Sequence, residues 1–227
     1  MVVEIPHLRA DAQRNLERIL EAARAVFARD GLDASVADVA ERAGVGTATI
    51  FRRFPTKDDL VSAVIEYDLE TFGARAREAL RSADPGEAIG EFMTSVIESF
   101  IEDRCFCEAM GSELFDRPRI QELVGGMTES IDSLLQRAQA AGAIRDDVVA
   151  ADIGFLVNAV AQAGLRLEHS APGAWRRYAE IVFGGLRPEG ARPLTHKPPT
   201  PQQFHEAKAA QSKRTSRTPP TQPPPAA

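Results

Sequence analysis

Residues 35–59, SVADVAERAGVGTATIFRRFPTKDD, decide the fold of this 227-residue chain. The stretch opens with four apolar residues at i, i+3, i+4 and i+7, which predicts a short amphipathic helix with one buried face: Val36, Val39, Ala40 and Ala43. Gly44 follows, and glycine adopts the backbone angles of a tight turn without steric cost. A second short helix over 47–54 then carries two adjacent arginines. Helix, glycine turn and second helix in this order are the layout of a helix-turn-helix.

The second helix has one apolar edge and one polar arc. At 100° per residue, Ile50 and Phe54 share an edge, so Ala48 and Arg52 point away from it. Thr49 and Arg53 lie on one flank, whereas Thr47 and Phe51 lie on the other. Such a helix fits a major groove. An arginine can bind guanine O6/N7 or a phosphate, and both readings of the arginine pair stay open.

Both helices that flank this region begin with a capping-box pattern. Ser35 is followed three residues later by Asp38, and Thr56 is followed by Asp59 in the same way. We therefore expect two helix N-termini whose N–H groups can also face phosphate oxygens.

Residues 44–57, GVGTATIFRRFPTK, resemble the motif of the TetR family of transcriptional regulators. That motif has Gly-Val, a few small or polar residues, Thr-hydrophobic-Tyr, two variable residues, Phe, and a short Pro/Ser/Lys restart. A predicted helix over 14–30, ended by Gly31, matches the first helix of the family. The likeness covers about the first 60 to 70 residues.

The resemblance implies which residues contact DNA. Ser35 and Lys57 would contact phosphates, and Thr47, Ala48 and Thr49 would approach base edges. The full set of expected contacts is Ser35, Thr47, Ala48, Thr49, Phe51, Arg52, Arg53 and Lys57. Phe51 stands where the family usually has tyrosine, so it lacks the phosphate-reaching hydroxyl and is expected to act mainly in packing. Arg53 is expected to contact the DNA backbone in its place.

The composition predicts an all-α protein whose DNA affinity is local. The chain is 44% hydrophobic, enough to bury a full core, and no long stretch alternates apolar and polar residues as a half-buried strand would. Its net charge of −6 argues against a broadly basic surface, so we expect a small basic cluster that acts through a dimer. No secretory signal and no apolar run of about 18 residues is found, and we therefore expect a cytoplasmic protein with no membrane partner.

Helix start and stop signals, together with a change in composition near residue 188, predict three segments along the chain. The segments are residues 10–56, residues 57–187 and residues 188–227, and the last is a proline-rich, basic tail that is disordered or extended. The resemblance implies that the first is the DNA-binding domain and the second a larger helical ligand-binding and dimerisation domain. Helices are predicted over 56–80, from Asp84 to about 101, 120–142, 147–167 and 174–186, with Asp84, Pro85 and Glu87 as a strong helix start.

Two further sites are expected in the second domain. Aromatic and methionine side chains between its helices form either plain core or a cavity for an apolar or amphipathic effector. These residues are Phe72, Phe92, Met93, Phe100, Phe106, Met110, Phe115 and Met127. The resemblance implies that the last two helices pair with their copies in a homodimer. The predicted interface residues are Leu156, Val160, Gly164, Trp175, Tyr178, Ile181 and Val182.

The sequence thus predicts a homodimeric repressor that a small molecule releases from a palindromic double-stranded DNA operator. An activator is an open alternative, as is a helical ligand-binding protein or enzyme that retains a vestigial helix-turn-helix. No nucleophile elbow, phosphate loop or dinucleotide fingerprint occurs, so we expect neither an enzyme nor a cofactor. Cys105 and Cys107 point to opposite sides of a helix and the four histidines are scattered, so no metal site is expected.

Overall fold

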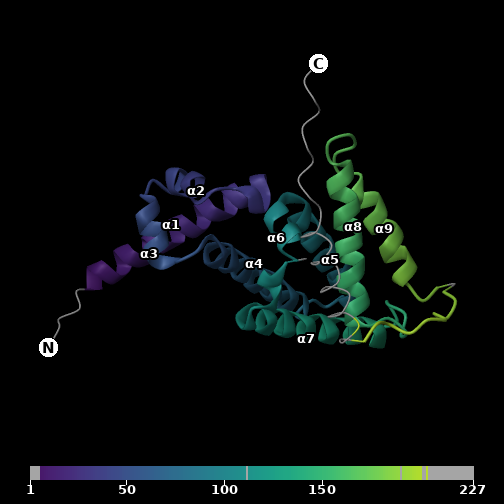
Figure 1. Ribbon diagram of the computed structural model, residues 1–227. Coiled ribbons are helices and arrows are strands. Elements are labelled where there is room, and N and C mark those ends of the chain that lie inside the picture. The colour runs from purple at the N-terminus through teal and green to yellow at the C-terminus, as the bar shows by residue number, and fades with distance from the viewer. Residues whose placement is uncertain (1–5, 111, 190, 201–202, 204–227) are drawn as a thin grey trace, which may run out of the picture.

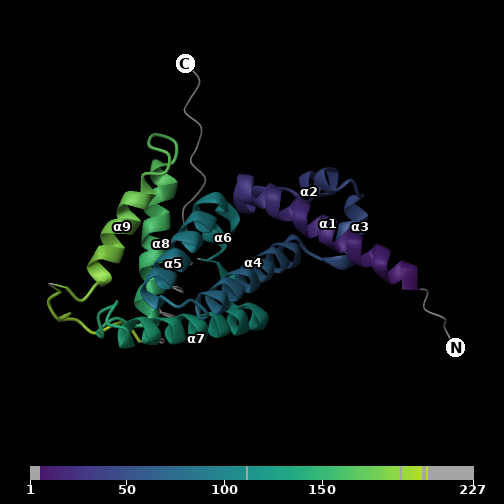
Figure 2. The ribbon, with the colours of Figure 1, turned by 180° about the vertical axis from the view of Figure 1, so that it is seen from behind.

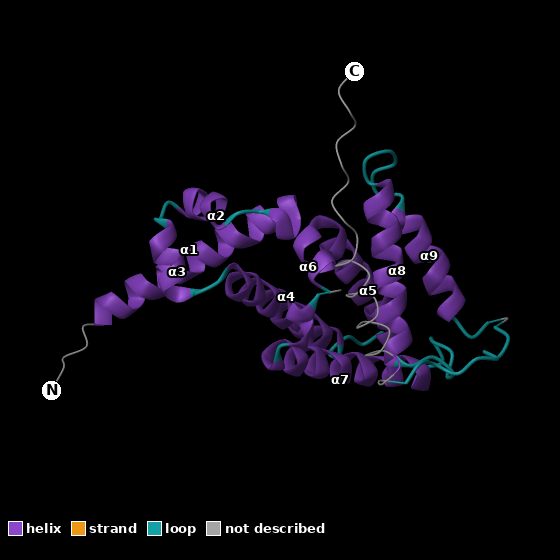
Figure 3. Cartoon of the chain, in the orientation of Figure 1, coloured by secondary structure: helices purple, strands orange, loops and turns teal. Residues whose placement is uncertain are grey.

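The computed structural model describes residues 6–110, 112–189, 191–200 and 203, and within them every regular element is a helix (Figures 1 and 3). The all-α prediction is therefore confirmed. The first elements are α1 (Pro6–Asp30), η1 (Gly31–Asp33), α2 (Val36–Ala43) and α3 (Thr47–Arg53). They are followed by α4 (Lys57–Ala79), α5 (Pro85–Glu102), α6 (Arg104–Ala109) and η2 (Glu113–Asp116). The last three are α7 (Pro118–Ala140), α8 (Ala150–Leu167) and α9 (Trp175–Leu186).

Helices α1 to α3 form a small unit at the N-terminal end of the molecule. The predicted apolar face of α2 is buried against α1, because Val36, Val39, Ala40 and Ala43 all lie in the core. Gly44 ends α2 in the left-handed conformation with a φ of 64°. Glycine has no Cβ penalty there, which explains why the chain can turn so sharply into α3.

Helix α4 links this unit to the second domain (Figures 1 and 2). It packs against α1 at one side and against α7 and α5 at the other. Helix α8 packs on α5 and α9, so these two C-terminal helices lie at the end of the molecule opposite to α3. Buried aliphatic and aromatic side chains run continuously from α1 to α9 as one core.

Several helix boundaries differ from the sequence-based prediction. Helix α1 starts at Pro6, eight residues before the predicted start at residue 14. The prediction missed this first part because the polar residues before Leu16 carry little apolar periodicity. Helix α6 and the 3-10 turn η2 were not predicted. With six and four residues they are too short for a periodic signal, and their main local signal is a side-chain cap, from Asp103 to the Phe106 N–H and from Ser112 to the Leu114 N–H.

The segment after α9 is held by the loop between α7 and α8. Arg145 Nη2 donates to the Arg192 carbonyl at 2.6 Å, and the Leu194 N–H donates to Asp147 Oδ2 at 2.8 Å. The start of the predicted tail therefore makes specific contacts, whereas residues 204–227 lie outside the described residues. None of the helices that the structure describes is long and apolar enough to cross a bilayer.

Candidate nucleic-acid interface

Helix α3 presents the arc that its sequence predicts. Ile50 is fully buried and Phe54 is 8% exposed, so this edge is fixed in the core. Arg52 and Arg53 are exposed, and neither guanidinium makes a hydrogen bond or ion pair with another described residue. Thr47 and Ala48 are also exposed, whereas Thr49 is half-buried. The face that points away from the protein is thus free to enter a groove, with two cations on it.

Phe51 is more accessible than a packing role requires. Its ring is 46% exposed on the same arc, although the sequence alone favours a structural role for this residue. An apolar ring on a reading helix can contact thymine methyl groups or sugar carbons.

Both predicted capping boxes are present. Ser35 Oγ accepts from the Asp38 N–H at 3.1 Å, and Asp38 Oδ2 accepts in return from the Ser35 N–H at 3.1 Å. Thr56 and Asp59 repeat this arrangement at the start of α4. The hydroxyl of Ser35 also donates to Asp38, and this hydrogen bond holds the pKa of Asp38 below its usual value. The side chain of Ser35 is therefore engaged in the cap, and a phosphate would have to share it.

Lys57 is placed differently from the expectation of a phosphate contact. Its side chain is half-buried, and its Nζ donates to the Leu32 carbonyl at 2.5 Å. The ammonium thus fixes η1, the turn between α1 and α2. A phosphate contact by Lys57 would use the remaining N–H donors of this ammonium.

Arg18 of α1 is a positioning residue that sequence reasoning missed. Its guanidinium donates to the Ala43 carbonyl at 2.6 Å, at the C-terminal end of α2. A cation at this end of a helix satisfies an unpaired carbonyl and interacts well with the helix dipole. Arg18 therefore holds the turn that sets α3 against α2. Donor and acceptor are 25 positions apart, so the contact leaves no local signal in the sequence.

A residue at the start of α7 binds the first turn of α4. Arg117, which precedes α7, forms an ion pair with Asp59 at 3.0 Å. The Thr56 hydroxyl first, and then Arg117, hold the pKa of Asp59 below its usual value. The first turn of α4, directly after the helix-turn-helix, is therefore tied to the start of α7 through a carboxylate that also caps α4.

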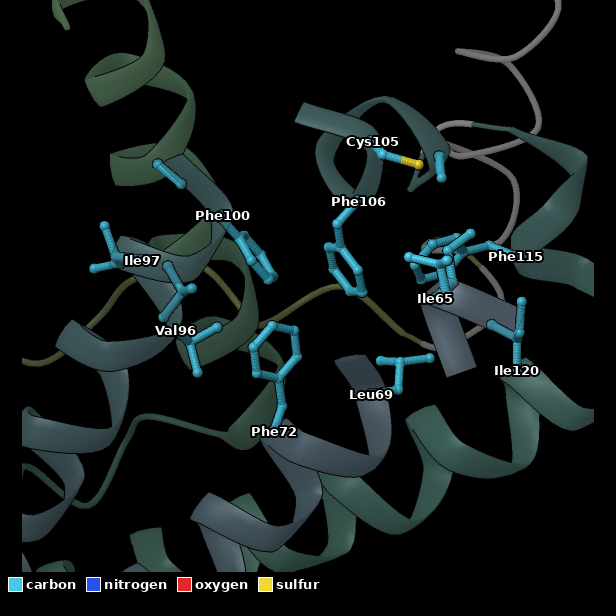
Figure 4. Packing of buried hydrophobic residues seen from close by; sticks show 14 of the residues in the cluster. Ile65, Leu69, Phe72, Val96, Ile97, Phe100, Cys105, Phe106, Phe115 and Ile120 are labelled. Atoms are coloured by element: carbon cyan, nitrogen blue, oxygen red, sulfur yellow. The ribbon is translucent and has the colours of Figure 1, made fainter. Parts of the chain in front are cut away.

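Four of the eight expected effector residues meet in one aromatic cluster, shown in Figure 4. Phe72 of α4, Phe100 of α5 and Phe106 of α6 have ring centroids 4.9 to 5.6 Å apart, and Phe115 of η2 stacks edge-on against Phe106 at 5.6 Å. Phe92 and Met93 are buried in the same core, whereas Met110 and Met127 are partly buried. The four rings fill the space between their helices with one another, as a packed core does.

The residues expected at a dimer interface divide into two groups. Val160, Gly164 and Trp175 are buried against other helices of the same chain. At Gly164, a Cβ would lie 2.5 Å from Ile101 Cδ1 and 2.9 Å from Trp175 Cβ. Leu156 and Val182 are half-buried.

The outward face of α8 and α9 carries the second group. Tyr178 is 43% exposed and Ile181 is 60% exposed. Phe155, which the prediction did not include, is 40% exposed. An apolar periodicity cannot tell which stripe meets α5 and which faces outward.

Two family models match the chain. Residues 19–64 match "Bacterial regulatory proteins, tetR family", and residues 84–188 match "Transcriptional regulator SbtR-like, C-terminal domain".

The chain is also similar to individual transcriptional regulators. The TetR transcription regulatory protein from Mycobacterium vanbaalenii is 34% identical; the match covers 79% of this chain and 99% of that one, with a TM-score of 0.60. The TetR regulator SCO0520 from Streptomyces coelicolor is 26% identical over 76% of this chain and 98% of that one, also with a TM-score of 0.60. The HTH-type transcriptional regulator UidR of Escherichia coli K12 is 25% identical over 147 residues, which are 63% of this chain and 75% of UidR.

The helix-turn-helix with its free cationic arc, the helical second domain and these matches lead to one conclusion. This chain belongs to the TetR family of transcriptional regulators.

Proposed function

We propose that the protein is a non-catalytic, cytoplasmic, homodimeric repressor that binds a partly palindromic operator and leaves it when a small apolar or amphipathic molecule binds the second domain. The observation that carries this proposal is the arc of α3. Its two arginines face outward without internal partners among the described residues, while the opposite edge is anchored by Ile50 and Phe54.

A dimer is needed because a single reading helix provides few contacts. The chain is acidic overall, so the electrostatic part of the DNA affinity comes from local cations of helices α1 to α3, which we call the reading unit. Two such units share one operator. The exposed face of α8 and α9, with Tyr178 and Ile181, is the surface that we assign to the partner subunit.

The effector would act through the aromatic cluster. Phe72 lies on α4, which also carries the reading unit, while Phe100, Phe106 and Phe115 come from three elements of the second domain. A ligand that separates these rings must shift α4 relative to α5 and α6. By linkage, the ligand then weakens operator binding by the same factor by which the operator weakens ligand binding.

The test of DNA reading starts from duplexes selected from a random pool by the wild-type protein. Arg53→Ala is expected to cost about 1–3 kcal/mol in operator binding, measured by fluorescence anisotropy at fixed salt. Arg81→Ala is the matched control, because Arg81 is 78% exposed on its side chain, pairs with Glu78 and lies outside the reading unit. If the two variants bind alike, Arg53 does not contact the operator. If the wild-type protein selects no duplex at low ionic strength, the proposed function is wrong.

The dimer has its own test. Ile181→Asp should convert the protein to a monomer in sedimentation analysis, whereas Leu194→Asp, at another exposed apolar side chain, should leave the dimer intact. An Ile181→Asp protein that stays dimeric would place the interface elsewhere.

A further inference from the structure

The backbone of Leu32 is held from both sides by two charged residues of other elements. Leu32 lies in η1, the turn that joins α1 to α2 of the reading unit. Its N–H donates to Glu108 Oε2 of α6 at 2.8 Å, and its carbonyl accepts from Lys57 Nζ at the start of α4. A carboxylate therefore serves the donor of this residue and an ammonium serves its acceptor. Charge-assisted hydrogen bonds of this kind are stronger than neutral ones.

The fit of Glu108 against this turn is close. Gly31 has a φ of 68°, and a Cβ placed on it would lie 2.4 Å from Glu108 Oε2 and 2.7 Å from Oε1. The carboxylate thus occupies the space that any side chain at position 31 would need. Glycine meets two requirements here, the left-handed backbone and the approach of Glu108.

Helix α6 is attached to the DNA-binding side of the molecule at its other end as well. Asp103 caps α6 by accepting from the Phe106 N–H at 3.0 Å. The charge of this carboxyl also acts on Asp68 of α4, which forms an ion pair with Arg24 of α1 at 3.1 Å. Between these two attachments, α6 places Phe106 in the aromatic cluster (Figure 4).

We propose that Glu108 is a positioning residue for operator reading: by holding the Leu32 backbone, it fixes the orientation of α2 and α3 relative to the second domain. This inference rests on the proposed function, because it assumes that two reading units engage one operator. It adds that the distance between the two units is set at η1 by a side chain of α6, which is not among the expected DNA contacts.

The physical reason is the cost of ordering. Two reading helices bind together only if they match half-sites about one DNA turn apart. A reading unit that is free to rotate at η1 must be ordered when both half-sites are occupied, and this lowers the affinity. A freed unit also adapts more easily to half-sites at a wrong distance, so the protein discriminates less between operator spacings.

The test compares Glu108→Ala with the conservative Glu108→Gln. Alanine leaves the Leu32 N–H without its acceptor, whereas the glutamine side-chain carbonyl can still accept from it. We expect Glu108→Ala to bind the selected two-half-site duplex about 5- to 20-fold more weakly, as for the loss of one charge-assisted hydrogen bond. Glu108→Gln should stay within about 3-fold of the wild type, because it retains the hydrogen bond but not its charge.

The decisive readout is spacing. Three duplexes are used: the selected operator, the same operator with one base pair inserted between the half-sites, and a single half-site. We expect Glu108→Ala to bind the selected operator more weakly and the half-site as the wild type does. The ratio of its affinities for the selected operator and for the operator with the inserted base pair should be smaller than in the wild type. Glu102→Ala, at an exposed glutamate that ends α5, is the matched control and should behave as the wild type.

Hydrogen exchange of the segment around Leu32 gives a second readout that does not depend on DNA. Exchange should be faster in Glu108→Ala than in Glu108→Gln or Glu102→Ala. The proposal is overturned if Glu108→Ala keeps the wild-type affinity and spacing preference, or if it loses affinity equally for the half-site and the full operator. A wild-type protein that selects no duplex would instead refute the proposed function, so the two failures are distinguishable.

Discussion

Two neighbouring carboxyls, the buried Asp68 and the half-buried Asp103, predict that the protein becomes less stable as the pH rises toward neutrality. Asp68 is 5% exposed on α4, and its Oδ1 accepts from Arg24 at 3.1 Å. Burial, followed by the charge of Asp103, raises the pKa of Asp68 to about 7, against the opposing effect of Arg24. Burial also raises the pKa of Asp103. The pair therefore keeps a proton that two separate carboxyls would release.

The charged and titratable groups around the pair come from three elements. Arg24 of α1 is the cation, and its guanidinium also stacks on Tyr67 at 4.4 Å from the ring centroid. Cys105 of α6 is a further titratable neighbour. Burial raises the pKa of its thiol to about 12, so it stays neutral while the carboxyls titrate.

The direction in which stability changes with pH follows from the number of protons bound in the folded and unfolded states. A folded-state pKa above the unfolded value means that the folded chain holds a proton which the unfolded chain has lost. Stability from this source is complete below the unfolded pKa of 3.8 and is lost as the pH rises to about 7. A difference of about three units, at roughly 1.36 kcal/mol each, gives an upper value of about 4 kcal/mol. The lowered pKa values of Asp38 and Asp59 act in the opposite direction, but only as the pH falls below about 4.

The assay is equilibrium unfolding by denaturant at pH 5, 6, 7 and 8, at one protein concentration because a dimer unfolds in a concentration-dependent way. Asp103→Asn is the informative variant. The asparagine oxygen can still cap the Phe106 N–H, while its amide donates to Asp68 without a shared proton. We expect the wild type to lose stability from pH 5 to 8. Asp103→Asn should lose less and be the more stable protein at pH 8, because it removes the charge of Asp103 but not the burial of Asp68.

Asp84→Asn is the matched control, since Asp84 caps α5 but is exposed and its cap contacts are backbone N–H groups. It should keep the wild-type pH dependence. A wild-type free energy of unfolding that is constant or rises between pH 5 and 8 would refute the reasoning, as would an equal slope in Asp103→Asn.

Two further predictions concern the tail and the buried thiol. A chain that ends at residue 200 should melt like the full chain, whereas one that ends at residue 188 should lose about 1 kcal/mol of stability, the worth of a typical hydrogen bond, because Asp147 then lacks the Leu194 N–H. Equal melting of the two truncated proteins, measured by circular dichroism, would contradict this. In a Cys107→Ser protein, the Cys105 thiol should react with Ellman's reagent at pH 8 only after unfolding, since it is buried and its pKa is raised to about 12. Rapid reaction of the folded protein would show that the thiol is accessible.

The reading unit could be predicted from the sequence because its signals are local. A capping box needs only residues three positions apart, and the turn needs one glycine with a positive φ, so Ser35, Gly44 and Thr56 mark the ends of their helices in the sequence itself. The apolar edge of α3 followed from its helical period for the same reason.

The tertiary structure alone decided what covers each apolar stripe and which distant residues meet. Helical period marks Trp175 and Ile181 equally as apolar, yet Trp175 is buried in the chain and Ile181 faces outward, since only the packing of α8 and α9 on α5 separates them. The partners Asp68 and Asp103 are far apart in the sequence, as are Leu32 and Glu108. Periodicity reports the neighbours of a residue along its own helix. Contacts between helices depend on how those helices are oriented in the folded chain, and short-range sequence patterns do not encode that orientation.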